Sequence, residues 1–496
     1  MSDHAIQFRP GRAVGAAGLA VALALAGAAA RAETLQDAIA LAYQSNPTLQ
    51  AQRAQLRALD ETYVQARSGL RPQVTAGLEG DYQQNLSTYN QPVEDVAASV
   101  SATQPLYTGG QITAETRAAE ADIEAGRQQL RQVEANVLQS VIGAYADVRR
   151  DQEALAIAQT NVEVLQSQLA ETRARFDAGQ RTRTDTAQAE ARLAAAQAQL
   201  SSAKAQLAVS RAAYAAVVGQ SPGDLAPPPD LPGLPASVDA AFDIAARDNP
   251  AILAADFDEQ AAAARVAVAK SANHPTVGLR AQVGETGYYA NDAALGLTGS
   301  LWARSITASA VFTQPLFTGG LNQSRVRQAL ETDNAKRIAI EAARRQTVQS
   351  VAQAWNQLAA AHANTASNAE QASADAVAFE GVKQEAGAGL RTTLDILNAE
   401  RELRSAELAL ADARRDEYLA GAGLLAAMGR LDVADLDPGL PAYDPQRAFD
   451  HVKRAGAVPW DGVVAGLDAI GAGPAPRPAP ASGAAGPVQA GGTVMP

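Results

Sequence analysis

Four short segments of the chain alternate between apolar and polar residues. They form two pairs, at 73–104 and 276–314. A period of two places successive side chains on opposite faces of a strand, so each pair predicts a β-hairpin with one apolar and one polar face. The apolar positions are Val74, Ala76, Leu78, Tyr82, Val96, Ala98, Val100 and Ala102 in the first pair, and Val277, Leu279, Ala281, Val283, Ile306, Ala308, Ala310 and Phe312 in the second. Each segment is close to the roughly nine to eleven residues that a tilted membrane strand requires.

Most of the remaining chain has helical periodicity. Residues 110–177 contain no proline and carry two rows of apolar residues spaced seven apart. The rows are Val141, Val148, Leu155, Val162, Leu169 and Phe176, and Ile123, Leu130, Val137 and Ala144. Sustained heptads predict coiled-coil packing rather than an isolated helix. One helix over these ~68 residues would be ~100 Å long, at about 1.5 Å per residue.

Shorter helical segments flank this long one. We expect them over 34–66 and 185–218. The same plan returns later in the chain, where shorter helices over 237–270 and 391–428 flank a second long helix over 320–386. Two short helices laid end to end have nearly the length of one long helix. Each set of one long and two short helices therefore predicts a straight antiparallel coil. In the second long helix the seam is marked less regularly, by Val348, Trp355 and Leu358.

The chain contains this plan twice. Asn46-Pro47 recurs as Asn249-Pro250, at an offset of 203. The run Gln104–Gly110, Gln-Pro-Leu-Tyr-Thr-Gly-Gly, returns at Gln314–Gly320 with Phe in place of Tyr, at an offset of 210. The later offset persists through the pairs Gly179 and Gly389, Asp185 and Asp395, and Glu190 and Glu400. The chain is therefore a tandem duplication, in which the second copy has one longer loop.

The duplication sets the expected domain boundaries. Residues 1–32 have the features of a secretory signal peptide, because two arginines precede an uncharged stretch that ends in Ala30-Arg31-Ala32. The remaining parts are a first repeat at 33–221, a Pro-rich linker at 222–236, a second repeat at 237–430, a C-terminal equatorial segment at 431–469 and a Pro-, Ala- and Gly-rich tail at 470–496. We expect the tail to be disordered, since it cannot bury a core.

Composition and charge exclude several classes of protein. The 496 residues include no cysteine, which excludes disulfides, thiolate metal sites, a cysteine nucleophile and an N-terminal lipid anchor. The 41 Lys and Arg against 53 Asp and Glu exclude the basic surface that nucleic-acid binding requires. The histidines are scattered, and no nucleophile stands with a base. We therefore expect neither an enzyme nor a cofactor or metal site.

Four strands predict an oligomer. The smallest membrane barrels have about eight strands, and an open edge in lipid would leave backbone groups unpaired. Twelve strands from three chains would close one barrel, which the helices would continue as a tube. The alternative is a soluble periplasmic coiled-coil adaptor or scaffold protein that carries the hairpins.

Three features resemble the TolC-family outer-membrane factors across essentially the whole mature length. They are the duplicated plan, the Gln-Pro-Leu-[Tyr/Phe]-x-Gly-Gly junction of each copy, and the Gly389–Ala399 turn, Gly-Leu-Arg-Thr-Thr-Leu-Asp-Ile-Leu-Asn-Ala. The resemblance implies a mainly α fold with membrane β: a homotrimer with a shared 12-stranded β-barrel, continued by a 12-helix periplasmic α-barrel. It also implies an exit duct in the outer membrane of a Gram-negative bacterium, extending into the periplasm, for type I protein secretion or multidrug efflux. The implied partners are outer-membrane lipid, a periplasmic adaptor (membrane fusion) protein and an inner-membrane ABC or proton-driven pump.

The resemblance also assigns candidate site residues. Asp395 would be the inward acidic residue of the periplasmic entrance, where three copies form a ring of like charges that binds cations. Asn398 stands where the family often has a second aspartate, which would weaken the ring. Arg391 matches the arginine that holds the entrance shut, with Thr184 and Asp185 as its acceptors. We call these last three residues the entrance latch.

The turns at Gly179 and Gly389 would be the coil tips that meet the adaptor. The strand-to-helix junctions are Gln104, Pro105, Gly109 and Gly110 in the first copy, and Gln314, Pro315, Gly319 and Gly320 in the second. Tyr288, Tyr289 and Trp302 flank the second hairpin loop, where they could form an aromatic belt or pack the loop.

Overall fold

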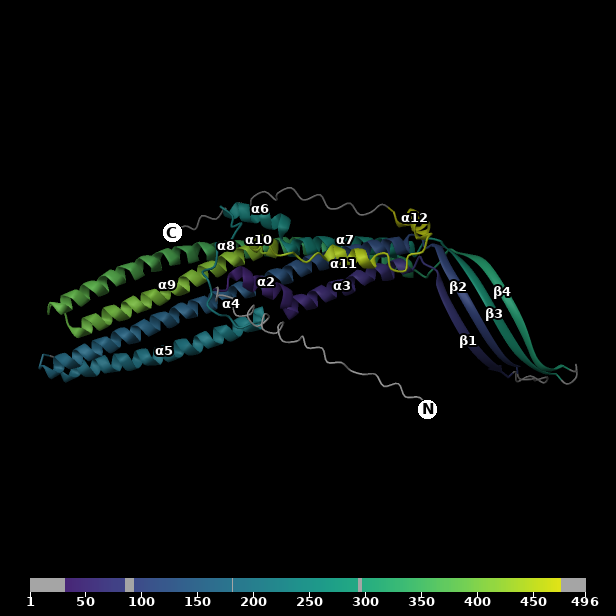
Figure 1. Cartoon of the computed structure of the whole chain (residues 1–496). Helices are drawn as coiled ribbons and strands as arrows, with labels where there is room; N and C mark the ends of the chain where they lie inside the picture. Colours follow the sequence, from purple (N-terminus) through teal and green to yellow (C-terminus); the bar gives the residue numbers. More distant parts are fainter. Residues whose placement is uncertain (1–31, 85–92, 181, 293–296, 474–496) are drawn as a thin grey trace, which may run out of the picture.

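The computed structural model of the chain describes residues 32–84, 93–180, 182–292 and 297–473. The expected signal peptide, apart from residue 32, and the tail from residue 474 lie outside these residues. The described chain is elongated and mainly helical, with two helical coils at one end and a curved sheet at the other (Figure 1).

Four strands form one antiparallel sheet in chain order. They are β1 (Gln73–Gln83), β2 (Val93–Tyr107), β3 (Thr276–Asp292) and β4 (Leu297–Thr313). The two hairpins lie where the alternation predicts them, and they are joined through β2 and β3. β2 runs three residues beyond the expected end at 104. Its register with β3 shifts between Pro105 and Tyr107, because proline offers no N–H to the ladder.

The strand register places the apolar residues of all four strands on one face of the sheet. Val100 lies opposite Val283, which in turn lies opposite Ile306. Ile306 is 78% exposed, so no other described part of the protomer covers the middle of this face. The opposite face is polar, and there the hydroxyls of Thr75 and Ser101 hydrogen-bond across the strands at 2.8 Å. The sheet therefore presents a polar face and an apolar face, and the described chain leaves the middle of the apolar face uncovered.

Two helices of 67 residues each follow the repeated Gly-Gly junctions. They are α4 (Gln111–Asp177) and α8 (Leu321–Gly387), close to the ranges that the heptads predict. Gly110 and Gly320, which precede them, both have φ of 86°, a left-handed conformation that glycine adopts at little cost. The returning helices are α5 (Arg183–Val218) and α9 (Thr393–Met428). The α4/α5 and α8/α9 coils lie beside one another (Figure 1).

The short helices are split in both copies, whereas a single helix was expected over 34–66 and over 237–270. The pieces are α2 (Leu35–Ser45), α3 (Pro47–Ser68), α6 (Val238–Asp248) and α7 (Pro250–Ser271). Each break falls at an Asn-Pro pair. The side chains of Asn46 and Asn249 accept backbone N–H bonds at 3.0 and 2.9 Å, and proline is the first helical residue. The repeated Asn-Pro is thus a helix start.

The main hydrophobic core lies where the short helices meet the middle of α4. Tyr145 and Tyr214 have no exposed surface there. The hydroxyl of Tyr145 donates to the carbonyl of Ala226 at 2.6 Å, and that of Tyr418 donates to the carbonyl of Pro229 at 3.0 Å. The Pro-rich linker is therefore fastened to both α4 and α9.

The C-terminal segment forms three further helices. They are α10 (Val433–Leu436), α11 (Pro445–Val452) and α12 (Asp461–Ala472). Phe449 of α11 packs edge-on against Tyr63 of α3, and α12 lies at the base of the sheet (Figure 1). Disorder was expected from residue 470, but the structure has helix as far as Ala472. The boundaries expected for the equatorial segment over 431–469 remain a prediction. The chain runs on to the sheet, and helix continues to Ala472 because Asp468 and Ala472 are buried there.

The two long helices differ in how far they are covered. α4 packs against α3, α5, α7 and α9, whereas α8 packs mainly against α7 and α9 and lies at one side of the protomer (Figure 1). Val141 and Val148 of the predicted seam of α4 are fully buried, but Phe176 is 40% exposed. On α8, Val348 is 51% exposed and Val351 is buried instead, which corrects the predicted seam.

Candidate entrance, clasp and strand-to-helix junctions

Matching turns at Gly179 and Gly389 form the far ends of the two coils. Both glycines are left-handed, with φ of 72° and 81°. The N–H of the residue after each glycine donates to the carbonyl five residues earlier, at 2.8 and 3.0 Å, as in a Schellman ending. Within the described residues, no atom lies within 4 Å of the place that a Cβ would take on either glycine. The tips are open, and their contact with an adaptor remains a prediction.

A capping box starts the helix that follows each tip. The N–H and Oγ1 of Thr392 donate to Oδ2 of Asp395 at 2.9 and 2.8 Å, and the N–H of Asp395 donates back to Thr392 Oγ1 at 3.3 Å. Thr182 and Asp185 repeat this arrangement in the first copy. The bonds from Thr392, aided by the charge of Arg391, lower the pKa of Asp395. Asp395 is therefore ionised, and it starts α9 in addition to any part in an entrance ring.

Arg391 forms its ion pair inside its own turn. Its Nε donates to Oε2 of Glu385 at 2.8 Å, and both side chains are about half exposed. This pair was not foreseen from the sequence, although the two residues are only six positions apart. The bond from Arg391 to Thr184 or Asp185 remains a prediction for the assembled protein.

The predicted entrance position Asn398 lies at a contact between the coils. Its Oδ1 accepts a long hydrogen bond of 3.4 Å from Arg192 of α5. The adjacent Leu397 is buried against Val162 and Leu165 of α4. Within one protomer, this part of α9 therefore packs directly on the first coil.

A cleft of about 620 Å³ lies between α4, α5 and α9, beyond this contact. Its charged lining residues are Arg150, Asp151, Arg192, Glu400, Arg401, Arg404 and Asp412. Glu400 is 1% exposed, and neither of its carboxylate oxygens has a hydrogen-bond partner in the described chain. Burial raises the pKa of Glu400 to about 7, and the charge of Arg404 offsets only part of this effect.

The duplicated position in the first copy is paired instead. Glu190 accepts from Arg173 at 2.6 Å, and both side chains are about half exposed. In the second copy Lys383 replaces that arginine and pairs with Glu380 of its own helix at 3.7 Å. Glu400 is left without a hydrogen-bond or ion-pair partner among the described residues. The signal in the sequence was this Arg-to-Lys change, which the repeat comparison did not weigh.

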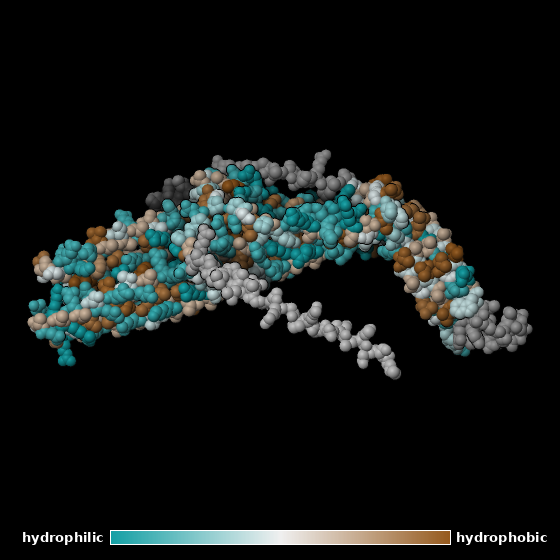
Figure 2. Space-filling view, in the orientation of Figure 1, coloured by the Kyte–Doolittle hydropathy of each residue, from teal (hydrophilic) through white to brown (hydrophobic). Residues whose placement is uncertain are grey.

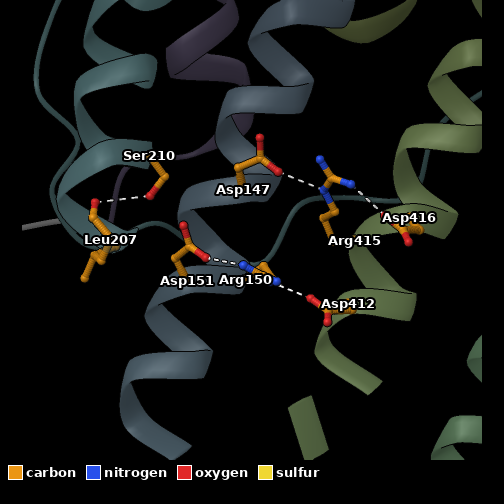
Figure 3. Close-up of polar contacts among 8 residues, drawn as sticks. All are labelled: Asp147, Arg150, Asp151, Leu207, Ser210, Asp412, Arg415 and Asp416. Atoms are coloured by element: carbon orange, nitrogen blue, oxygen red, sulfur yellow. Dashed lines mark hydrogen bonds and ion pairs between the residues drawn. The ribbon is translucent and has the colours of Figure 1, made fainter. Parts of the chain in front are cut away.

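Reciprocal ion pairs join α4 of the first coil to α9 of the second (Figure 3). Arg150 of α4 donates through Nε to Asp412 of α9 at 2.5 Å, and Arg415 of α9 donates through Nε to Asp147 of α4 at 2.7 Å. Each arginine also donates to the aspartate that follows it in the chain, at 2.6 and 2.7 Å. We call Asp147, Arg150, Asp412 and Arg415 the clasp.

The clasp was not predicted from the sequence, although the sequence contains a signal for it. Residues 146–151 are Ala-Asp-Val-Arg-Arg-Asp, and residues 411–416 are Ala-Asp-Ala-Arg-Arg-Asp. Their offset differs from the 210 of the tandem repeat, so the similarity is not part of the duplication. Because α4 and α9 run antiparallel, the two copies of the motif can face each other. The second arginine of each copy then donates to the first aspartate of the other copy.

The strand-to-helix junctions are held by their repeated glutamines. Gln104 donates through Nε2 to the carbonyl of Leu70, after α3, at 2.8 Å. Gln314 donates to the carbonyl of Asn273, after α7, at 3.1 Å. Each glutamine also donates to the carbonyl of the proline that follows it. The junction glutamines therefore tie the strand to the end of the preceding short helix in both copies.

The first junction has an additional support from α12. The carboxylate of Asp468, which has no exposed surface, accepts bonds from the N–H and hydroxyl of Thr108, both at 2.7 Å. It also accepts from the N–H and hydroxyl of Thr113 and from the N–H of Gly110. Burial opposes the ionisation of Asp468, but these bonds outweigh it and lower the pKa. Asp468 thus caps α4 from 355 or more positions away in the chain.

The two junctions therefore differ in what covers them. A Cβ on Gly110 would lie 2.1 Å from the backbone N of Ala472, whereas nothing in the described chain lies within 4 Å of the same position on Gly320. Leu316 and Phe317 of the second junction are 93% and 89% exposed. One sequence motif thus has two environments in the same chain.

The described residues contain no group of three or more His, Asp or Glu placed to hold a metal ion. None of the described helices combines the length and apolar character that a bilayer span demands. Trp302 is 60% exposed on the apolar face of the sheet, while the side chains of Tyr288 and Tyr289 lie outside the described part.

Known proteins match both repeats. The family model described as "Outer membrane efflux protein" matches residues 38–220 and 242–430. The outer membrane efflux protein BepC of Brucella suis is 34% identical over 445 residues, which cover 89% of this chain and 95% of BepC. The outer membrane protein TolC of Vibrio cholerae is 29% identical over 436 residues, covering 85% of this chain and 97% of that protein.

The fold matches solved structures as well. The open state of the MtrE outer membrane channel of Neisseria gonorrhoeae superimposes with a TM-score of 0.64 at 25% identity, over 80% of this chain and 89% of MtrE. The expectation of a mainly helical chain with TolC-like architecture is confirmed by these matches.

Proposed function

The chain belongs to the outer membrane efflux protein family, and from that premise we propose that three copies build one duct from the periplasm across the outer membrane. The protein is an outer-membrane exit channel for efflux or type I secretion and not an enzyme. Channels of this kind form trimers and work with adaptor proteins and inner-membrane pumps. The adaptor, pump and cargo of this chain are part of the proposal.

The four-stranded sheet carries this proposal. Its outer strands β1 and β4 each have one edge without a strand partner in the described chain. Such an edge is unstable in lipid, where backbone groups find no water to bond. Pairing β4 of one copy with β1 of the next closes a barrel of twelve strands, four from each of three chains. The apolar face then meets lipid, and the polar face lines the lumen.

The lumen face of this barrel is acidic toward the hairpin loops. Asp81 lies directly opposite Asp95, and Glu79 projects from the same face two residues before Asp81. Arg280 lies on this face nearer the helices, opposite Thr103. Three copies would place acidic residues around the outer part of the lumen, which favours the passage of cations over anions.

The entrance lies at the opposite end of the duct. Three copies of Asp395 form an acidic ring there, and Arg391 of one chain exchanges its Glu385 partner for Thr184 or Asp185 of a neighbouring coil when the entrance is shut. The tips at Gly179 and Gly389 meet the adaptor. The exposed state of both tips and the exposed pair between Arg391 and Glu385 support this arrangement.

A bilayer experiment with the purified full-length protein tests the duct. We expect native mass spectrometry in detergent to give the mass of three chains. Insertion of the same sample into planar bilayers should raise the conductance in discrete steps. A chain that fractionates with the soluble periplasm as a monomer, without conductance, would favour the adaptor or scaffold alternative and overturn the duct.

A further inference from the structure

Helix α12 is fixed rigidly at the base of the sheet. One side of it, formed by Val464, Asp468 and Ala472, is buried against the first junction. At its start, Asp461 pairs with Arg71 at 3.2 Å, and both side chains are about 10% exposed. The helix is therefore held at its start by Asp461 and along its buried side by Asp468, and both carboxylates are shielded from water.

α12 lies on the apolar side of the sheet. The indole N–H of Trp460, the residue before the helix, donates to Oε1 of Gln104 at 3.2 Å. Gln104 lies opposite Leu279 in the strand register, two residues beyond Ala102, and so projects from the same face as the apolar row. In a closed barrel this face points outward. The helix is thus outside the barrel wall and not in the lumen.

The side of α12 that faces away from the junction is apolar. Trp460, Val463, Leu467 and Ile470 are 48%, 68%, 45% and 78% exposed. Their spacing of three, four and three residues places them on one stripe of the helix. Figure 2 shows brown hydrophobic atoms over α12 that continue onto the adjoining part of the sheet. The exposed stripe is therefore continuous with the surface that meets lipid in an outer-membrane barrel.

We propose that α12 is a membrane-surface helix whose exposed stripe rests in the periplasmic leaflet of the outer membrane, beside the barrel wall. The proposal rests on the proposed function, since it places the apolar sheet face in lipid. Trp460 fits this level of the bilayer, because its ring is half exposed while its N–H is bonded to protein. With 12 residues, α12 is too short to span the bilayer and would lie along its surface.

The second junction argues that this role is separate from supporting the turn. The Gln314–Gly320 turn keeps the same glycine conformations without any helix over it in the described chain. A helix is thus not required to form the junction. What α12 adds to the first junction is an apolar stripe directed away from the protein, at the level where the strands enter lipid.

The lack of cysteine allows a direct test in the full-length protein. Single variants Leu467→Cys and Ile470→Cys are labelled with a nitroxide and reconstituted in phosphatidylethanolamine–phosphatidylglycerol vesicles. Power saturation measures access of oxygen, which concentrates in lipid, and of a water-soluble nickel chelate. Ile306→Cys on the sheet face is the lipid reference, and Gln180→Cys at the coil tip is the water reference. Gly462→Cys, on the flank of α12 where a Cβ meets no atom within 4 Å, is the matched control.

We expect the oxygen-to-nickel ratio at 467 and 470 to exceed that at 180 by about threefold and to stay below that at 306, because surface helices bury their apolar side only about 5–10 Å deep. Gly462→Cys should resemble the water reference. If the oxygen-to-nickel ratios at positions 467 and 470 equal the water reference while the ratio at position 306 is that of lipid, this proposal is overturned and the duct is not affected. Exclusion of both reagents at 467 and 470 would also overturn it, since a neighbouring copy would then cover the stripe. An oxygen-to-nickel ratio at position 306 as low as that of the water reference would refute the proposed function itself.

Discussion

The Nε of Arg150 on α4 lies 2.5 Å from Oδ1 of Asp412 on α9, and this ion pair bridges the two helical coils of one protomer. The reciprocal bond from Arg415 to Asp147 completes the clasp. Farther toward the tips, α9 meets the first coil again at Leu397, and the cleft that contains Glu400 lies between these two contacts. Separation of the coils therefore has to break the clasp or pivot about it.

Removing half of the clasp should loosen the coils. We expect Asp412→Ala to raise the single-channel conductance of the duct and its open fraction, because one coil-to-coil charge pair is lost. Asp412→Glu, which keeps the negative charge on α9, should retain most of the original behaviour. Exposed pairs contribute under about 1 kcal/mol each, so a change of a few-fold in open fraction is the expected size. Glu341→Ala, which breaks a pair within α8 alone, is the control and should change neither quantity.

Arg391→Ser tests the entrance latch. We expect it to raise single-channel conductance in planar bilayers, because the proposed bond to Thr184 or Asp185 of a neighbouring coil is lost. Glu385→Gln removes the partner of Arg391 seen within the protomer and frees the arginine for the latch, so it should not raise conductance. Unchanged conductance in Arg391→Ser would remove the latch assignment.

The charge of Asp395 can be separated from its capping role. Asp395→Asn keeps an oxygen for the N–H of Thr392 but removes the negative charge. We expect it to abolish block of the channel by divalent cations without lowering the unfolding temperature. Asp395→Ala would also lose the two bonds that its carboxylate accepts from Thr392, which is one half of the capping box, while the N–H of residue 395 can still donate to Thr392. Asp185→Asn makes the same change in the first copy and is the control. If Asp185→Asn abolishes the block by divalent cations as fully as Asp395→Asn does, Asp395 is not the specific site of that block.

Glu400 should make the stability of the protein depend on pH. Its pKa is raised to about 7, so the neutral acid is the favoured form in the closed cleft. The raised pKa contributes stability that is full below about pH 4.5 and is lost as the pH rises through 7. We expect Glu400→Gln to raise the unfolding temperature of the trimer at pH 8 but not at pH 5. The gain in the free energy of unfolding at pH 8 should not exceed about 3 kcal/mol for each chain. Glu190→Gln, at the exposed and paired position, should show no such difference between the two pH values.

The two junction glycines form a matched pair for testing α12. Gly110→Ala and Gly320→Ala both place a Cβ on a backbone with φ of 86°, which costs roughly 1–2 kcal/mol. Only the first variant also drives that Cβ into the backbone of Ala472. We expect Gly110→Ala to expose α12 to limited proteolysis and Gly320→Ala to leave it protected. Equal protection in both variants would contradict the contact between α12 and the junction.

Much of the fold follows from local patterns in the sequence. Strand alternation and heptads predict the sheet and the long helices, because each pattern reports which face an element buries. The Asn-Pro breaks were also readable, since Asn46 and Asn249 are good helix caps and a proline follows each. Val348 was misassigned because the alanine-rich α8 gives a weak apolar row, and the helix has few partners within the protomer.

The contacts that position the candidate sites were harder to foresee. Asp468 meets Thr108 across 360 positions, and no periodicity links a C-terminal helix to that turn. Lys383 pairs with Glu380 of its own helix, and the sequence does not indicate which acid a lysine at this position contacts. Two traces were readable: the repeated Ala-Asp-x-Arg-Arg-Asp motif of the clasp, and the change from Arg173 to Lys383 beside Glu400.

The two edges of the sheet that have no strand partner in the described chain also constrain the order of assembly. A single chain that entered the bilayer would carry two rows of unpaired backbone groups into hydrocarbon, whereas its helices can associate in water through their exposed apolar residues. The coils of three chains are therefore expected to meet before or while their sheets enter the membrane. Barrel closure then becomes the last, cooperative step of biogenesis, and a lone protomer is a species that the cell has to shield.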